Sequence, residues 1–328
     1  MQRREFITLV GSAAAASWPL AARAQQRAVP VIGYLGAQSP HAFASRVRAF
    51  SQGLDEAGFA EGRNVTIEFR WAEGQHNRLS ALAADLAGRQ VDVIVAPGGA
   101  PAAIAAKSAT TTIPIVFEMG ADPIAMGLVS SLNRPGGNLT GVSSLNVEVS
   151  PKRLDLLREL IPAASAVAVL INPTSPTADS QSRNLQAAAD VLGLKLHVLH
   201  AALESDFAGA FEALRQLRPD GLVVASDGFF ATHSEQLAAQ TVRHAVPAIH
   251  QSRDFTLAGG LMSYGGDFME SHRQAGIYTG RILKGEKPAD LPVQLVTKVE
   301  LFINLNAAKT LGVTVPLPLL GRADQVIE

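Results

Sequence analysis

The sequence predicts an α/β protein of two lobes, each built on a parallel sheet, and three observations support this fold class. The chain has 328 residues, which at about 150 residues per domain corresponds to two domains. Short apolar runs alternate with amphipathic helical patterns, as in parallel sheets covered by helices. This alternation restarts near residue 150. We therefore expect two doubly wound parallel-sheet lobes joined by a hinge.

The first series of elements covers residues 28–144 and is expected to form the N-terminal lobe. Apolar runs predict strands at 31–35, 65–69, 91–96, 113–117 and 140–144. Between the first two strands, apolar residues recur at steps of three and four and predict an amphipathic helix: Phe43, Val47, Phe50 and Leu54. A second helical stripe at 79–86 ends at Gly88.

The second series covers residues 145–265 and is expected to form the C-terminal lobe. It begins with a helix at 150–161, because Ser150 suits the N-cap and Pro151 the first helical position. Strands are predicted at 167–171, 196–199, 221–225, 247–250 and 261–264. Helical patterns lie between them.

The rest of the chain is too short for a third domain. It contains a helical pattern at 268–283, a strand pattern at 294–303 and a short helix that ends at Gly312. We expect residues 266–290 to complete the N-terminal lobe and residues 291–328 to complete the C-terminal lobe. The chain would then pass between the lobes about three times, which makes a multi-strand hinge.

The first 24 residues are expected to be an export signal. Arg3 and Arg4 precede an apolar, alanine-rich stretch at 6–20, and Ala22-Arg23-Ala24 supplies a small-x-small cleavage pattern. Paired arginines before a weakly apolar stretch are typical of a twin-arginine signal. The alternative is an amphipathic N-terminal helix. A membrane anchor is disfavoured because the apolar stretch is short for a bilayer about 30 Å thick.

Composition excludes several classes of function. With 28 Lys and Arg against 29 Asp and Glu, the net charge is −1, which favours neither nucleic acid nor a charged membrane as a partner. The absence of cysteine excludes disulfides, thiolate metal sites, cysteine nucleophiles and a lipidated cysteine. No catalytic or nucleotide-binding motif occurs along the chain. The sequence therefore offers no local motif for an enzyme, a cofactor or a metal, and we expect none of the three; a catalytic triad assembled from distant residues stays open.

Loops at the carboxyl ends of parallel strands provide the candidate binding residues, because such sheets bind ligands there. In the first half these are Gln38, Ser39, Trp71, Gly98, Gly99, Ala100, Asp122 and Asn146. In the second half they are Asn172, Ser175, Asp227, Phe229, Tyr264 and Asp267.

Several of these candidates also have a structural interpretation. Gly98 and Gly99 precede a small-residue helix and either receive an anion on backbone N–H groups or only form a turn. Ser39 and Ser175 either donate hydroxyls to a ligand or cap helices. Asp227 either binds a cation or caps a helix. Asp122 is also suited to a plain turn, Trp71 to packing and Asn146 to bracing the hinge.

Several segments across nearly the whole chain after the export signal resemble one known family. They are FRWAEG at 69–74, DP at 122–123 with GLV at 127–129, RPGGNLTG at 134–141, SPKRL at 150–154, MSYG at 262–265, ILKG at 282–285, KPADLP at 287–292, INL at 303–305 and ADQVIE at 323–328. The chain resembles the solute-binding component of an ABC importer, in the tryptophan/tyrosine-type substrate-binding family. The resemblance implies the type I periplasmic-binding-protein fold.

The resemblance implies a periplasmic, soluble and monomeric receptor that closes on a small ligand and presents it to a membrane permease and its ATPase. Many relatives carry a lipoprotein cysteine, and this chain has none, so no lipid anchor is expected. Two alternatives stay open. One is an exported enzyme on a similar two-lobe scaffold, and the other is a ligand-sensing subunit of a membrane receptor.

The charges of the candidate loops favour a ligand that carries an amine and a carboxylate. Asp122, Asp227 and Asp267 lie in these loops, whereas cations are almost absent from them. A purely anionic ligand would normally recruit arginine or lysine. The sequence therefore predicts an amino acid with an apolar or aromatic side chain, its amine on Asp227, its carboxylate on the N–H groups near Gly98 and Gly99, and its apolar part near Phe229, Phe230 and Trp71.

Overall fold

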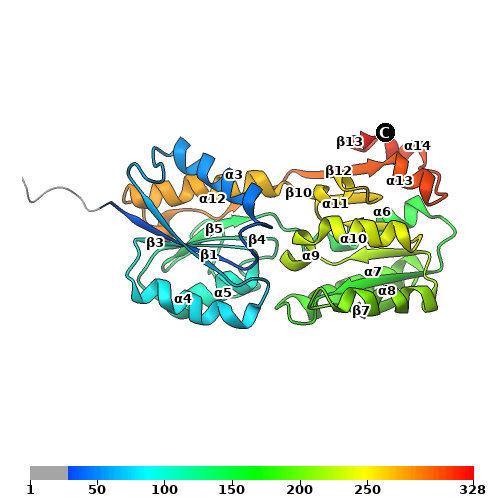
Figure 1. Cartoon of the computed structure of the whole chain (residues 1–328), viewed down its shortest axis with the longest axis horizontal. Helices are drawn as coiled ribbons and strands as arrows, with labels where there is room; N and C mark the ends of the chain where they lie inside the picture. The colour runs from blue at the N-terminus through cyan, green and yellow to red at the C-terminus, as the bar shows by residue number, and fades with distance from the viewer. Residues whose placement is uncertain (1–28) are drawn as a thin grey trace, which may run out of the picture.

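A computed structural model describes residues 29–328 and shows two α/β lobes side by side (Figure 1). The expected export signal at 1–24 lies outside the described residues. No helix within the described part is both long and apolar enough to cross a bilayer.

The N-terminal lobe is a six-stranded parallel sheet with the order β11-β5-β4-β3-β1-β2. Its strands are β1 (Val31–Gly36), β2 (Thr66–Trp71), β3 (Val93–Pro97), β4 (Ile115–Met119), β5 (Leu139–Ser143) and β11 (Gln294–Leu295). Its helical elements are α3 (Ala44–Glu56), η2 (His76–Arg78), α4 (Leu79–Gly88), α5 (Ala100–Ala109), α12 (Phe268–Leu283) and η3 (Pro288–Asp290).

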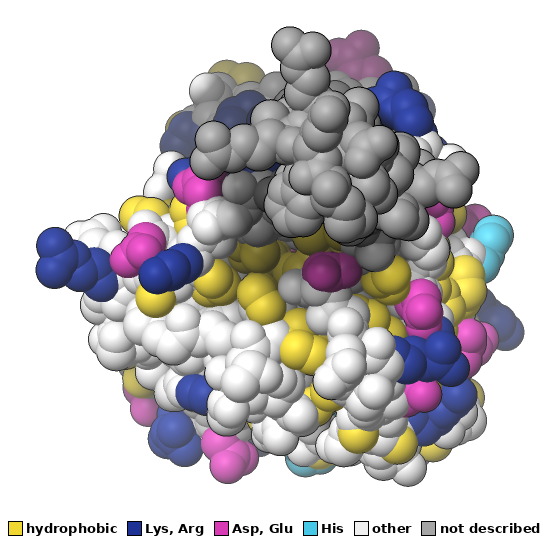
Figure 2. All heavy atoms as spheres, turned by 90° about the vertical axis from the view of Figure 1, so that its left-hand side faces the viewer, with side chains coloured by type: hydrophobic (Ala, Val, Ile, Leu, Met, Phe, Trp, Pro, Cys, Tyr) yellow, Lys and Arg dark blue, Asp and Glu magenta, His cyan; other side chains and the backbone are white. Residues whose placement is uncertain are grey.

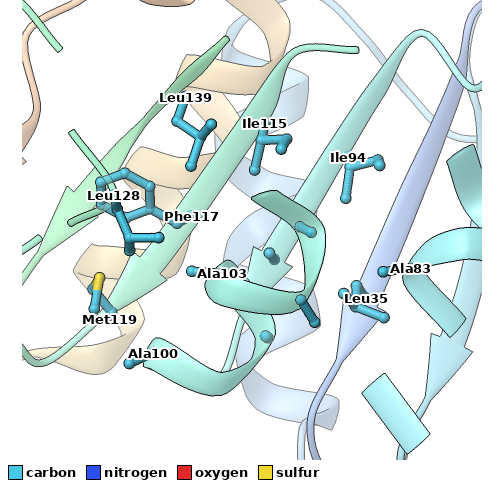
Figure 3. Close-up of a cluster of buried hydrophobic side chains, with 14 of the residues drawn as sticks. Leu35, Ala83, Ile94, Ala100, Ala103, Ile115, Phe117, Met119, Leu128 and Leu139 are labelled. Atoms are coloured by element: carbon cyan, nitrogen blue, oxygen red, sulfur yellow. The ribbon is translucent and has the colours of Figure 1, made fainter. Parts of the chain in front are cut away.

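Helices cover both faces of this sheet, with α4 and α5 on one side and α3 and α12 on the other (Figure 1). On the α5 side, leucine, isoleucine and phenylalanine from the strands meet an alanine-rich helix face, as Leu35, Ile94 and Ala103 illustrate (Figure 3). Small side chains let α5 lie close to the sheet. They therefore fix the position of the Gly98-Gly99 turn from which α5 starts.

On the other face, α3 and α12 touch backbone to backbone. A Cβ on Gly53 of α3 would lie 1.8 Å from the carbonyl oxygen of Arg273, and one on Gly276 of α12 would lie 2.1 Å from that of Phe50. Only glycine fits at both positions. This contact fixes α12, which comes late in the chain, against the first lobe.

The C-terminal lobe is a seven-stranded sheet with the order β13-β12-β10-β9-β8-β6-β7, in which only the β10–β12 pairing is antiparallel. Its strands are β6 (Ala166–Ile171), β7 (Lys195–His200), β8 (Gly221–Val224), β9 (Ala248–His250), β10 (Met262–Gly266), β12 (Val299–Asn304) and β13 (Gln325–Ile327). Its helices are α6 (Ser150–Leu160), α7 (Ala178–Leu192), α8 (Asp206–Leu217), α9 (Gly228–Thr232), α10 (Ser234–Arg243), α11 (Arg253–Leu257), α13 (Leu305–Thr310) and α14 (Leu317–Leu320).

The predicted fold class is confirmed: both sheets are doubly wound and mainly parallel, and the chain passes between them three times. The passes lie between β5 and α6, between β10 and α12, and between β11 and β12. The single strand expected at 294–303 is wrong, because β11 belongs to the first sheet and β12 to the second. The third pass therefore lies near residues 296–298, and the first lobe extends beyond the expected boundary at 291.

The charged surface agrees with the nearly neutral composition. Figure 2 views the outer end of the N-terminal lobe and shows acidic and basic side chains next to one another among polar and apolar groups. No large field of one sign is visible on this end. The unusual charges of the molecule lie instead in its interior, between the lobes.

Candidate functional site

A cavity of about 560 Å³, counted to its open mouth, lies between the two lobes. The N-terminal lobe contributes Arg46, His76, Gly98, Gly99, Ala100, Pro101, Glu118, Gly120 and Ala121. The C-terminal lobe contributes Ser175, Thr177, Ser226, Asp227, Gly228 and Gln251, and Val147 and Phe268 come from the hinge region.

The lobes touch each other beside this cavity. A Cβ on Gly228, the first residue of α9, would lie 3.1 Å from the carbonyl oxygen of Gly98. Next to it, Oγ1 of Thr232 lies 3.4 Å from Oε1 of Gln38 across the cleft. The missing side chain of Gly228 lets the two loops approach closely. The structure thus shows a closed arrangement of the lobes.

Asp227 is the acidic group on the C-terminal wall. It follows β8 and is the N-cap of α9, where Oδ1 accepts from the N–H of Phe229 at 2.9 Å and from Nδ2 of Asn172 at 3.1 Å. Within residues 29–328, Oδ2 accepts no hydrogen bond, and the residue is 8% exposed. Asp227 therefore caps a helix with one oxygen and has the other available to a ligand.

A buried network around Arg153 supports this wall. The Arg153 guanidinium donates to Oγ of Ser226 at 2.7 Å and to the carbonyl oxygen of Tyr264 at 2.6 Å. Ser226 donates onward to the carbonyl oxygen of Asn146 at 2.8 Å. Oδ1 of Asn146 accepts from the N–H of Gly266 at 2.9 Å. These bonds connect the end of β8 to the first two passes between the lobes.

Burial lowers the pKa of Arg153 to about 9, because no carboxylate compensates its charge and its partners are neutral oxygens. A buried cation that is fully hydrogen-bonded still favours a negative charge nearby. Arg153 is one of the largest fully buried side chains of the described part.

The N-terminal wall carries two ionisable side chains, Arg46 and Glu118. Arg46 is on α3, is 4% exposed, and lies over the rings of Phe43 and Phe268 at 4.7 and 4.8 Å from their centroids. Glu118, near the end of β4, is 3% exposed, and its Oε1 has no hydrogen-bond partner. Both residues line the cavity.

Burial raises the pKa of Glu118 to about 7, although the Arg46 charge and the backbone N–H of Gly98 oppose the rise. Nε2 of His272 lies 3.8 Å from Oε2 of Glu118. Burial and the Arg46 charge lower the pKa of His272 to about 3, so its imidazole is neutral near pH 7. The His272–Glu118 contact is therefore not an ion pair.

Five of the predicted site residues line the cavity: Gly98, Gly99, Ala100, Ser175 and Asp227. Gln38, Ser39 and Phe229 lie together in a neighbouring groove at the junction of the lobes. Asn172 lies behind Asp227, to which it donates a hydrogen bond.

The other five predicted residues have structural roles. Trp71 stacks on Phe69 at 5.7 Å within an aromatic cluster of the first lobe, and Tyr264 packs on the core of the second lobe. Asp122 accepts from the N–H of Ile124 in a turn. Asp267 caps α12, and Asn146 braces the hinge. Their side chains are used in caps, turns and packing, which the loop positions alone did not reveal.

The expected carboxylate site on the N–H groups near Gly98 and Gly99 stays a prediction. One of these donors is already used, because the N–H of Gly99 donates to the carbonyl oxygen of Glu118 at 3.2 Å. The expected apolar contacts also change, because Phe230 is fully buried in the second lobe. Phe268 is the phenylalanine that reaches the cavity.

Sequence reasoning missed Arg46, Glu118, Gln251 and Phe268. For two of them the sequence pattern could have indicated a functional role: Arg46 is a charged residue within the apolar face of a helix, and Glu118 is a carboxylate within an apolar strand. The sequence around Gln251 and Phe268 has no such feature. No group of three His, Asp or Glu side chains in the described part is arranged to hold a metal ion.

Comparisons with known proteins identify relatives of this two-lobe arrangement. The family model described as ABC transporter substrate binding protein matches residues 38–327. A tyrosine-binding protein of Clostridioides difficile (strain R20291) is 27% identical over 265 residues, which cover 80% of this chain and 75% of the relative.

Two solved structures are similar over almost the whole chain. One is an ABC domain from Streptococcus pneumonia in complex with L-Trp, with a TM-score of 0.82, 26% identity, and coverage of 92% of this chain and 100% of that one. The other is a conserved domain protein from Vibrio cholerae, with a TM-score of 0.84, 28% identity, and coverage of 91% and 100%.

Proposed function

The chain belongs to the family of ABC transporter substrate-binding proteins, and we propose that it is an extracytoplasmic receptor that captures an aromatic amino acid for import. Its architecture is that of the type I periplasmic binding proteins. The family and the relatives named above are binding proteins, which supports a role in capture and not in catalysis.

The observation that carries this proposal is the cavity to which both lobes contribute charged side chains. A ligand that contacts both walls is bound fully only when the lobes are closed, so binding favours the closed state. The amine of the ligand binds Oδ2 of Asp227, the oxygen that the helix cap leaves available. The L-Trp complex and the tyrosine-binding relative support an aromatic side chain.

A thermal-shift screen of the mature protein against amino acids, aromatic acids, sugars and purines tests the ligand class. A ligand at 100 times its Kd raises the free energy of unfolding by about 2.7 kcal/mol. We expect tryptophan or tyrosine to raise the Tm most. A shift with sugars or inorganic anions alone would contradict the proposal.

Titration calorimetry on Asp227→Asn tests the amine contact. Asparagine keeps the capping oxygen, so the variant removes the charge and preserves α9. We expect a loss of affinity of about 10- to 150-fold, the effect of one charge-assisted hydrogen bond. The control is Asp190→Asn, an exposed position near the end of α7. Equal affinity of the two variants would overturn the assignment.

The import role and the cellular location have separate tests. Deletion of the gene should abolish high-affinity uptake of the labelled ligand; undiminished uptake would instead favour the sensing role. Replacement of Arg3 and Arg4 by lysine should retain the precursor in the cytoplasm, because the paired arginines are read by the export machinery. Export at the normal rate would contradict a twin-arginine signal.

A further inference from the structure

Arg46 is a buried cation at the cavity that has no hydrogen-bond or ion-pair partner among the described residues. Within residues 29–328, its guanidinium donates no hydrogen bond and no carboxylate oxygen lies within 4.0 Å. It lines the cavity and also a second groove between the lobes. A buried charge that lacks a partner is destabilising, so its retention needs a reason other than stability.

Two aromatic rings hold this guanidinium in place. Phe43 precedes α3, and Phe268 is the first residue of α12, at the second pass between the lobes. Both rings contact the guanidinium carbon at less than 5 Å. Stacking on aromatic rings occupies the faces of a guanidinium and leaves the in-plane N–H groups for an acceptor. The planar N–H fork of arginine matches a carboxylate in two parallel hydrogen bonds.

The acidic groups near Arg46 do not satisfy it. Glu118 lines the same cavity, and Asp254 lies on α11 across the second groove. Both interact with the Arg46 charge electrostatically, without a hydrogen bond to it. Of the backbone donors near Gly98 and Gly99, the N–H of Gly99 is already used by the carbonyl oxygen of Glu118, and backbone N–H groups are neutral. Arg46 is therefore the strongest donor that the N-terminal wall presents to the cavity.

We propose that Arg46 binds the carboxylate of the ligand, so that the two charges of one amino acid are held by opposite lobes. This inference rests on the proposed function, in which Asp227 of the C-terminal wall takes the amine. The carboxylate completes the N-terminal wall and the amine completes the C-terminal wall. Recognition of the zwitterion and closure of the lobes are then the same event.

The test compares L-tryptophan with tryptamine, which lacks the carboxylate, by titration calorimetry on the full mature protein. Wild type should bind L-tryptophan at least tenfold more tightly than tryptamine. Arg46→Gln should lose about 10- to 150-fold in affinity for L-tryptophan and change little for tryptamine. Arg46→Lys should be intermediate, because an ammonium lacks the planar fork. The control is Arg48→Gln, an exposed arginine of the same helix.

Equal losses for both ligands in Arg46→Gln would make Arg46 a structural residue, and no loss for either would remove it from the site; both outcomes overturn the inference. If Arg46→Gln does not fold, Arg46→Lys and Phe268→Leu test the inference instead, since each should reduce the preference for L-tryptophan over tryptamine. If wild type binds no aromatic amino acid, the proposed function fails on its own. The Arg46 variants are then compared on whichever carboxylate-containing ligand the thermal-shift screen identifies and on the amide of that ligand. If the screen identifies no ligand with a carboxylate, both the proposed function and the role of Arg46 are overturned.

Discussion

The two walls of the cavity are built in opposite ways. On the C-terminal wall, the polar side chains have hydrogen-bond partners: Arg153 donates to Ser226, Ser226 donates to the carbonyl oxygen of Asn146, and Asn172 donates to Asp227. On the N-terminal side, buried polar atoms lack partners. Of six such atoms in the described part, four belong to Tyr34, Gln38, Glu118 and His272, in or against the first lobe, and the other two to His250 and Thr256.

The difference indicates which wall is complete before a ligand arrives. Buried polar groups are nearly always hydrogen-bonded, and exceptions need an explanation such as a missing partner. The C-terminal wall is preorganised by its own side chains. The N-terminal wall, with Arg46 and Glu118, has donors and acceptors that a ligand in a closed cavity can use. Each prediction below perturbs one of the two lobes and compares the result with a matched variant or with wild type.

The largest expected effect is the loss of Arg153. Arg153→Ala removes a donor from oxygens of Asn146, Ser226 and Tyr264 and creates a cavity, so we expect the free energy of unfolding to fall by about 3 kcal/mol or more. Urea unfolding measures this change. The control, Arg183→Ala on the exposed face of α7, should lie within about 0.5 kcal/mol of wild type. Equal stability of both variants would mean that the C-terminal wall is not held by this network.

The next effect is a pH dependence that arises in the N-terminal wall. The folded-state pKa of Glu118 is raised from 4.5 to about 7, so the folded protein holds its proton where the unfolded chain has lost it. As the pH rises from 4.5 to 7, this group therefore lowers the free energy of unfolding, by about 3 kcal/mol, and the loss stays constant at higher pH. Glu118→Gln should lack this contribution. Parallel stability curves of the two proteins between pH 4.5 and 8 would contradict it.

A pair of glycines compares the packing of the lobes. Gly276→Ala forces a methyl group into the backbone of Phe50 and should destabilise the first lobe by about 1–3 kcal/mol or more. Gly209→Ala on α8 of the second lobe meets nothing within 4 Å and should stabilise by about 0.4–1 kcal/mol. Thermal unfolding of both variants shows whether each substitution raises or lowers the stability. A stabilised Gly276→Ala would show that α3 and α12 are not in close contact.

The smallest effect concerns two tyrosines. The hydroxyl of Tyr34 is buried without a partner, so Tyr34→Phe should change the free energy of unfolding by less than about 0.5 kcal/mol or stabilise the protein. The hydroxyl of Tyr278 donates to the carbonyl oxygen of Pro292 at 2.8 Å, and Tyr278→Phe should cost about 1 kcal/mol. A larger loss of stability for Tyr34→Phe than for Tyr278→Phe in a denaturant titration would mean that the Tyr34 hydroxyl has a hydrogen-bond partner in the ligand-free protein.

Most of the fold was predictable because buried parallel strands are continuous apolar runs, and helices between them repeat at three and four residues. The prediction of a single strand at 294–303 was wrong for a physical reason. Apolar runs report burial but not the sheet that buries them, and β11 and β12 are separated by only Val296, Thr297 and Lys298. A change of lobe within three residues leaves no mark in such a pattern.

The site was predictable where it lies on loops after strands, as at Asp227 and Gly98. It was missed where the functional side chain lies inside a regular element. Arg46 is on the buried face of α3, and Glu118 follows Phe117 in β4, so the periodic pattern assigned both segments to the core. Partners distant in sequence, such as Phe268 beside Arg46, depend on the α3–α12 contact and not on local sequence.

Small-angle scattering tests most directly the central claim that one ligand joins the two walls. We expect saturating L-tryptophan to reduce the radius of gyration of the mature protein, because its two charges hold Asp227 and Arg46 together across the cavity. Tryptamine at saturation should leave the radius near the ligand-free value. An unchanged radius with L-tryptophan, or an equal reduction with tryptamine, would contradict the claim.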